Sequence, residues 1–149
     1  MRFIIPRMNM AFICLFLLLQ GCKTEPEPIH YGSDACAVCR MIIVDPHFGA
    51  ELITVKGKIY KFDSIECMVK YLRSNSSLDL KQDRCLVVDH SRTGELVDIE
   101  KANFLFSEQL LSPMGESLSA FGSKDSLNQY LQRFGGQAIS WNELSNRVK

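Results

Sequence analysis

Short apolar or alternating runs dominate the first half of this chain and predict β-strands. The alternation of apolar and polar positions, the β-branched content and the flanking turn residues are those of strands rather than helices. Lys56-Gly57-Lys58 lies between two runs and predicts the turn of a hairpin. The turn Ser91-Arg92-Thr93-Gly94 leads into a further β-rich region that extends to Phe106. The strand predictions before that turn cover residues 41–44, 51–55, 59–62 and 85–88.

One segment between these runs changes to a helical period. Its apolar residues follow the i, i+3, i+4, i+7 spacing of an amphipathic helix and are Ile65, Met68, Val69 and Leu72. Asp63, three residues before Glu66, predicts a capping box at the start of the helix. The polar residues 73–77 predict its end.

The second half of the chain repeats the pattern of the first. Phe62, Ser64, Tyr71 and Leu72 recur as Phe121, Ser123, Tyr130 and Leu131, always 59 positions later. A second helix then stops at Gly135-Gly136, and residues 137–141 predict a following strand. We therefore predict an α+β fold of two related halves, each with a helix packed on antiparallel strands. The halves are residues 33–90 and 91–149 of a domain that spans 33–149.

The N-terminus has the pattern of a bacterial lipoprotein signal. Two arginines within residues 1–7 precede an apolar run at 8–19, which is shorter than the ~20 residues of a membrane-spanning helix. The run ends at Leu19-Gln20-Gly21-Cys22, which resembles a lipobox. We predict a signal peptide at 1–21, lipidation of Cys22 and a polar, proline-containing tether at 22–32. The alternative is an ordinary cleaved signal peptide followed by a chance cysteine.

Charge and cysteine content narrow the function. The formal net charge is zero and no basic tract is present, so nucleic acid is not an expected partner. Membrane association is expected to come from the lipid. Four cysteines follow Cys22 in a chain predicted to be exported, and are compatible with disulfides, a zinc site, a redox pair or a copper site. Zinc fits less well, because the CxxC pair lacks a second pair at similar spacing.

The segment Cys36-Ala37-Val38-Cys39-Arg40-Met41 gathers two thiols and a thioether within six residues. Soft sulfur donors at this density favour Cu(I). If Cys39 and Met41 lie on a strand, their side chains share one face, so both sulfurs can reach the same ion. Met114, between Pro113 and Gly115, is the predicted third ligand because related halves could place it opposite, and Cys36 is the predicted substitute.

Other candidate ligands have ordinary structural interpretations. Met68 shares the apolar stripe of the helix and Cys85 opens an apolar strand, so both are predicted to be buried. Cys67 is either a small core residue or a thiol whose pKa the helix N-terminus lowers. His47 is either a loop residue exposed to solvent or an imidazole ligand, so the full ligand set stays open.

The order of short motifs along the mature chain resembles the NosL family of lipid-anchored copper chaperones. The matching residues are Cys36, Cys39, Met41, Asp45, Phe48 to Ala50, Gly57 to Asp63, Cys67-Met68, Tyr71-Leu72, Pro113 to Gly115, Ala120-Phe121 and Phe134 to Gly136. Family members typically carry Cys-Gly-Met where this chain has Cys39-Arg40-Met41, and Cys36 is an additional thiol. The resemblance implies a two-part α+β fold related to that of organomercurial lyase. It also implies periplasmic delivery of Cu(I) to nitrous oxide reductase during its maturation.

We therefore expect a copper chaperone anchored by lipid on the periplasmic side of a cell membrane or outer membrane, and no enzyme activity. A cuproenzyme, with nitrous oxide reductase favoured, is the expected acceptor, and a membrane transporter is a further possible partner. The competing hypotheses are an extracytoplasmic thiol-disulfide oxidoreductase that uses Cys36 and Cys39, and a purely structural lipoprotein. The oxidoreductase is disfavoured because redox-active CxxC pairs usually lie at the start of a helix, whereas the residues that follow Cys39 predict a strand.

Overall fold

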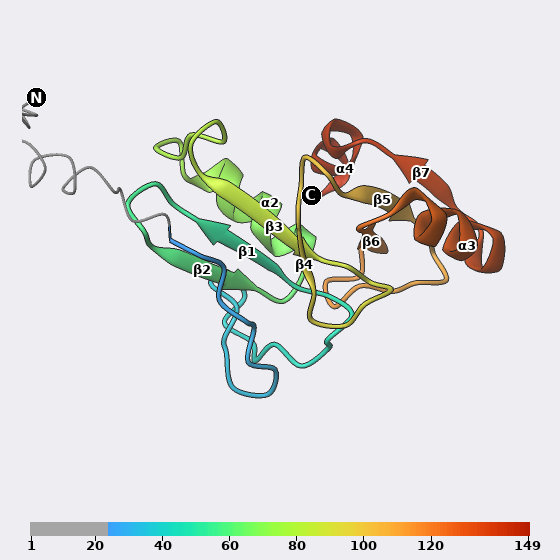
Figure 1. Cartoon of the computed structure of the whole chain (residues 1–149), viewed down its shortest axis with the longest axis horizontal. Helices are drawn as coiled ribbons and strands as arrows, with labels where there is room; N and C mark the ends of the chain where they lie inside the picture. Colours follow the sequence, from blue (N-terminus) through green and yellow to red (C-terminus); the bar gives the residue numbers. More distant parts are fainter. Residues whose placement is uncertain (1–23) are drawn as a thin grey trace, which may run out of the picture.

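The structure, a computed structural model, describes residues 24–149, which form two antiparallel sheets that each carry a helix (Figure 1). The strands are β1 (Ala50–Ile53), β2 (Ile59–Phe62), β3 (Arg84–Val88), β4 (Leu96–Asp98), β5 (Asn103–Phe106), β6 (Leu118–Phe121) and β7 (Gln137–Ile139). The helices are α2 (Ile65–Ser74), α3 (Lys124–Phe134) and α4 (Trp141–Arg147).

The two sheets share one connectivity. The strand order is β2-β1-β3-β4 in the first sheet and β6-β5-β7 in the second, and all named pairs are antiparallel. In each sheet a hairpin leads into a helix, and the next strand pairs on the other side of the first strand. The predicted α+β fold, with a helix packed on antiparallel strands in each half, is confirmed.

The residues that recur along the sequence occupy equivalent positions. Ser64 and Ser123 are the N-caps of α2 and α3, where each hydroxyl accepts a hydrogen bond from a backbone N–H in the first turn. The final phenylalanine of the preceding strand packs against a helix tyrosine in both halves. The ring centroids are 5.4 Å apart for Phe62–Tyr71 and 4.8 Å apart for Phe121–Tyr130.

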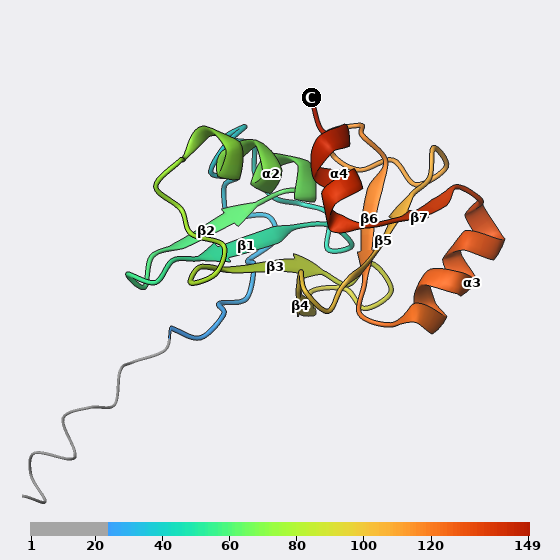
Figure 2. The same cartoon turned by 90° about the horizontal axis from the view of Figure 1, so that it is seen from above.

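Both sheets contribute to one apolar core. Leu52, Phe62 and Met68 from the first half belong to the same buried cluster as Phe104 and Leu118 from the second. Met68 and Cys85 are buried, as predicted. Helix α4 lies between α2 and the second sheet (Figure 2). There the Arg73 guanidinium donates hydrogen bonds to the carbonyls of Ser145 and Val148.

The predicted strand at 41–44 is wrong. This segment makes a single isolated bridge, from Ile42 to Ala35, and Met41, Ile42 and Val44 are exposed. Arg40 adopts a φ of 64° in the turn that brings this segment back beside residues 32–36, where backbone hydrogen bonds join Ile43 to Gly32 and Asp34. The apolar, β-branched run therefore pairs only with the short segment before the CxxC turn and is not part of either sheet.

Two boundaries also differ from the prediction. The strand predicted at 137–141 ends at Ile139, because Ser140 and Glu143 form a capping box that starts α4 at Trp141. The capping box predicted from Asp63 and Glu66 is absent from α2, whose cap is Ser64.

The N-terminal segment of the described chain lies along the first sheet. The Glu27 N–H donates to Oε1 of buried Glu51 at 3.2 Å, and the side chain of Ile29 is buried. The predicted signal peptide and lipidation site, Cys22, lie outside the described residues. Within residues 24–149, no helix is long and apolar enough to cross a membrane.

Candidate metal centre

The CxxC segment forms a tight turn that β2 holds in place. The Arg40 N–H donates to the Cys36 carbonyl at 3.1 Å, and the Cys36 N–H donates to the Met41 carbonyl at 2.9 Å. The Ala37 N–H then donates to the Lys61 carbonyl of β2 at 2.9 Å. These backbone bonds fix Cys36 and Cys39 beside the end of β2.

The junction between β2 and α2 supplies the opposite side. Asp63 follows the last residue of β2, and Cys67 lies in the first turn of α2. The Cys67 N–H donates to the Ser64 hydroxyl at 3.4 Å, so the helix cap also fixes the thiol-bearing residue. The predicted capping box does not form, because both side chains have other partners. The Asp63 carboxylate accepts a hydrogen bond from the Cys39 thiol, and the buried Glu66 carboxylate accepts one from the Ser112 hydroxyl.

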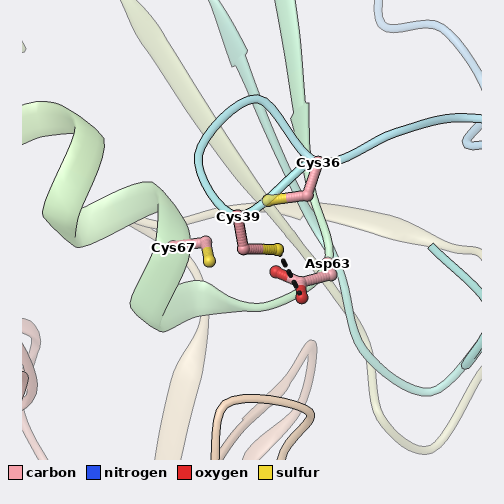
Figure 3. Close-up of side chains that lie close together, drawn as sticks. All are labelled: Cys36, Cys39, Asp63 and Cys67. Atoms are coloured by element: carbon pink, nitrogen blue, oxygen red, sulfur yellow. Dashed lines mark hydrogen bonds between the residues drawn. The ribbon is translucent and has the colours of Figure 1, made fainter. Parts of the chain in front are cut away.

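Four side chains converge between these two segments and form what we call the thiol cluster: Cys36, Cys39, Cys67 and Asp63 (Figure 3). Their ligand atoms, three Sγ and one carboxylate oxygen, all lie within 4.8 Å of one another. Cys36, Cys67 and Asp63 are buried, and Cys39 is half-buried. The cluster is therefore accessible mainly at Cys39.

The thiols of the cluster differ in acidity. A hydrogen bond from the Cys67 thiol, helped by backbone N–H groups of Asp63, Val38 and Cys39, lowers the pKa of Cys36 to about 6. Burial, with smaller contributions from Cys36 and Asp63, raises the pKa of Cys39 to about 11. The hydrogen bond to Cys36, followed by burial, raises the pKa of Cys67. The hydrogen bond from the Cys67 thiol thus favours the thiolate form of Cys36.

Such a donor set suits a soft metal ion. Thiolates select Cu(I), zinc and iron-sulfur clusters, whereas a carboxylate is a harder donor. Asp63 already accepts a hydrogen bond from the Cys39 thiol, with Sγ and Oδ2 3.3 Å apart. The three sulfurs are accordingly the expected ligands for Cu(I), and Asp63 positions one of them. Four-coordinate zinc would instead use the carboxylate as a ligand.

The predicted site residues fall into two groups. Cys36 and Cys39 lie together in the thiol cluster. The Met41 side chain is 63% exposed, and Met114 is half-buried against the core. Because 41–44 forms no strand, the argument that placed Cys39 and Met41 on one strand face no longer applies. Ligation by the two methionines stays a prediction.

Asp63 and Cys67 are absent from the ligands predicted from sequence. A signal for Cys67 was present, because a strand end followed by a helix cap places a first-turn residue beside that strand end. No pattern in the neighbouring sequence indicated that the CxxC turn would pack against the same end of β2. The four described cysteines 36, 39, 67 and 85 are all free thiols.

His47 lies apart from the thiol cluster. Its Nδ1 is 3.0 Å from the His90 carbonyl oxygen, and its ring is exposed. His90 is buried among aromatic rings, with centroids 4.9 Å away for Phe48 and 5.3 Å away for Tyr130. Burial lowers the pKa of His90, which favours its neutral form in the core.

Comparison with known proteins identifies the family. The NosL family profile matches residues 29–148. The chain belongs to the NosL family. In a structural comparison, it resembles the crystal structure of the copper chaperone NosL from Shewanella denitrificans. The TM-score is 0.66 at 20% sequence identity, over 82% of this chain and 96% of that one.

No curated protein sequence matches the chain. NosL is a family of copper chaperones and not of enzymes, in agreement with the expectation from sequence. The CxxC turn also lacks a following helix, because Arg40 turns the chain into an extended segment. The thiol-disulfide oxidoreductase hypothesis therefore has neither family nor structural support.

Proposed function

We propose that this NosL-family protein is a lipid-anchored, extracytoplasmic Cu(I) chaperone that binds its cargo at the thiol cluster. The main support for this proposal is that three sulfur atoms and one carboxylate oxygen lie within 4.8 Å of one another. Cys36, Cys39 and Cys67 hold the ion, with Met41 and Met114 as the further predicted ligands. Asp63 orients the Cys39 thiol.

Loading of Cu(I) follows from the acidity of the thiols. Cys36, whose pKa is about 6, provides a thiolate as the first ligand at neutral pH. Cys67 and Cys39 lose their protons when the ion binds, because a thiolate is the ligating form. Uptake of copper is therefore coupled to proton release.

Release of Cu(I) starts at the accessible side of the cluster. Cys39 is half-buried, whereas Cys36 and Cys67 are buried. An incoming thiol or thioether of an acceptor can therefore replace Cys39 first and then receive the ion. The thioether of Met41, two residues further on and 63% exposed, is neutral and can hold the ion transiently during this exchange.

The acceptor we propose is nitrous oxide reductase, on the basis of the resemblance to NosL, and we propose a membrane transporter as a further partner. The lipobox-like sequence at Cys22 supports anchoring on the periplasmic side of a membrane. Anchoring would confine the chaperone to the compartment in which its acceptor matures.

An anaerobic Cu(I) titration against a chromogenic chelator tests the site, with the reduced mature chain and three variants. We expect one Cu(I) per wild-type protein and loss of competition in Cys39→Ser and Cys67→Ser. Cys85→Ser is the matched control, because Cys85 is a buried free cysteine outside the cluster. Absence of competition by the wild type would reject the copper function. Zinc retained in preference to Cu(I) would indicate a structural zinc site.

A transfer experiment tests the acceptor. Copper-loaded chaperone is incubated with copper-free nitrous oxide reductase, and copper in each protein is measured after separation. We expect transfer from the wild type and from Cys85→Ser, whose cluster is intact, and no copper in the acceptor when Cys39→Ser is treated with Cu(I) in the same way. Stable one-to-one binding of Cu(I) without transfer would reject this acceptor and leave the metal site standing.

A further inference from the structure

The first described residues lie against one end of the first sheet. Thr24 Oγ1 is 2.9 Å from the position that a Cβ on Gly57 would occupy, in the turn between β1 and β2. A single residue, Lys23, separates Thr24 from Cys22. Two trans peptide units span at most ~7.6 Å between Cα atoms. A lipid on Cys22 would therefore hold this end of the sheet at the membrane.

Exposed apolar and basic side chains share that end of the sheet. Val55 is 67% exposed, and the adjacent Lys56 and Lys58 are exposed. Asp83 joins the neighbouring loop to the turn, because its Oδ1 accepts from the Val55 N–H at 2.9 Å. That loop adds Leu80, which is 48% exposed, and Lys81. We call this set, residues 55–58 with 80 and 81, the hairpin-tip surface.

The charges of the hairpin-tip surface suit anionic headgroups. Lysine side chains can extend toward lipid phosphates while their apolar stems cover Val55 and Leu80. Two exposed carboxylates lie near it, Glu25 and Asp79. The Asp79 carboxylate already accepts hydrogen bonds from the Lys81 N–H at 3.0 Å and from Gln82 Nε2 at 2.8 Å.

We propose that the hairpin-tip surface rests on the anionic lipid headgroups of the membrane that carries the Cys22 anchor. This inference rests on the anchoring in the proposed function. It adds an orientation, because a lipid tail alone would leave the domain free to rotate. The contact also gives a role to apolar side chains that lie outside both the core and the metal centre.

The orientation directs the thiol cluster away from the membrane. Strand β2 runs from Ile59 beside the turn to Phe62, which directly precedes Asp63 (Figure 1). The five steps along the chain from Lys58 to Asp63 extend over roughly 17 Å at ~3.4 Å per residue. The half-buried Cys39 is then presented to an acceptor on the aqueous side.

Depth-dependent tryptophan quenching tests the contact on the full lipidated chain. Trp141 is the only tryptophan of the chain, so the reporter variants are made in a Trp141→Phe background, in which the introduced tryptophan is the only one. Val55→Trp reports on the hairpin-tip surface. Val44→Trp is the matched control, because Val44 is 69% exposed and lies five residues after Cys39. The proteins are reconstituted into vesicles of phosphatidylglycerol and acyl-brominated phosphatidylcholine, and Leu80→Trp serves as a second reporter.

We expect the brominated lipid to quench the tryptophan fluorescence of Val55→Trp at least twofold more than that of Val44→Trp. The quenching of Leu80→Trp should be similar to that of Val55→Trp. Replacing phosphatidylglycerol with phosphatidylcholine is expected to reduce the difference. Equal quenching at both ends, in protein that floats with the vesicles, would overturn the orientation and leave anchoring intact. Equal quenching in the two lipid mixtures would overturn the anionic preference. Lipid-processed protein that does not float would overturn the anchoring itself.

Discussion

The Cys39 thiol donates a hydrogen bond to Oδ2 of Asp63 across 3.3 Å and thereby joins the CxxC turn to the β2–α2 junction. The carboxylate disfavours a second negative charge beside it, so it helps burial to raise the pKa of Cys39. The accessible thiol of the cluster therefore stays protonated in the metal-free protein. The protonated form is the less nucleophilic one, so Cys39 is expected to react slowly in the metal-free protein.

Asp63→Asn is expected to make Cys39 more reactive. The amide oxygen can still accept the thiol hydrogen, but the negative charge is gone, so the pKa of Cys39 falls. Each pKa unit changes the thiolate fraction about tenfold well below the pKa. We expect alkylation of Cys39 by iodoacetamide at pH 8 to accelerate severalfold, as measured by peptide mass spectrometry. Asp45→Asn is the control, and an unchanged Cys39 rate in Asp63→Asn would contradict the role of the charge.

Cys36 predicts a pH dependence of stability in the reduced, metal-free protein. Its pKa is lowered from 9.0 to about 6 in the folded state, so the native protein loses the thiol proton before the unfolded chain does. The resulting stabilisation is fully present above pH 9 and is lost as the pH falls through about 6. Relative to Cys36→Ser, the wild-type free energy of unfolding should rise between these values.

Urea unfolding at several pH values measures this difference. The extra slope is at most about 1.4 kcal/mol per pH unit for one group. Cys85→Ser should keep the wild-type slope below about pH 8, because Cys85 is protonated there in both the folded and the unfolded protein: its ordinary pKa is 9.0, and burial raises the pKa in the folded state to about 12. Identical slopes for wild type and Cys36→Ser would show that Cys36 is not ionised in the folded protein.

Arg40 is expected to destabilise the CxxC turn. Its φ of 64° is left-handed, a conformation that costs a side-chain-bearing residue about 1–2 kcal/mol. Glycine adopts this conformation freely, although it loses more entropy on folding. Arg40→Gly should raise the free energy of unfolding by about 0.5–1 kcal/mol. Arg40→Ala retains the strain and should not stabilise; equal effects of both variants would remove strain as the cause.

Local patterns were sufficient to predict the repeated architecture. The apolar spacing that starts at Ile65 identified α2, and the recurrence of Phe62 and Ser64 as Phe121 and Ser123 identified an equivalent strand end and helix cap. These features depend on residues a few positions apart. Local propensity and periodicity were therefore enough to predict α2, α3 and the equivalence of the two halves.

The thiol cluster depends on contacts that no local pattern encodes. The hydrogen bond from the Ala37 N–H to the Lys61 carbonyl brings the CxxC turn to the end of β2, and so places Cys36 beside Cys67. Propensity was also misleading at 41–44, where apolar residues remain exposed beside the metal centre. Two of the predicted ligands, Cys36 and Cys39, lie in the cluster, whereas its other two members come from this long-range packing.

Met41→Ala is expected to weaken Cu(I) binding on the order of tenfold, as for loss of a supporting group at a metal site. The Cys36 N–H donates to the Met41 carbonyl at 2.9 Å, which keeps the Met41 backbone beside the CxxC turn, and the unbranched side chain is exposed and flexible. Val44→Ala is the matched control, because Val44 is 69% exposed and Met41 is 63% exposed. Competition titrations give the affinities. An unchanged affinity in Met41→Ala would remove Met41 from the site, and equal losses in both variants would indicate a general effect of the exposed apolar segment.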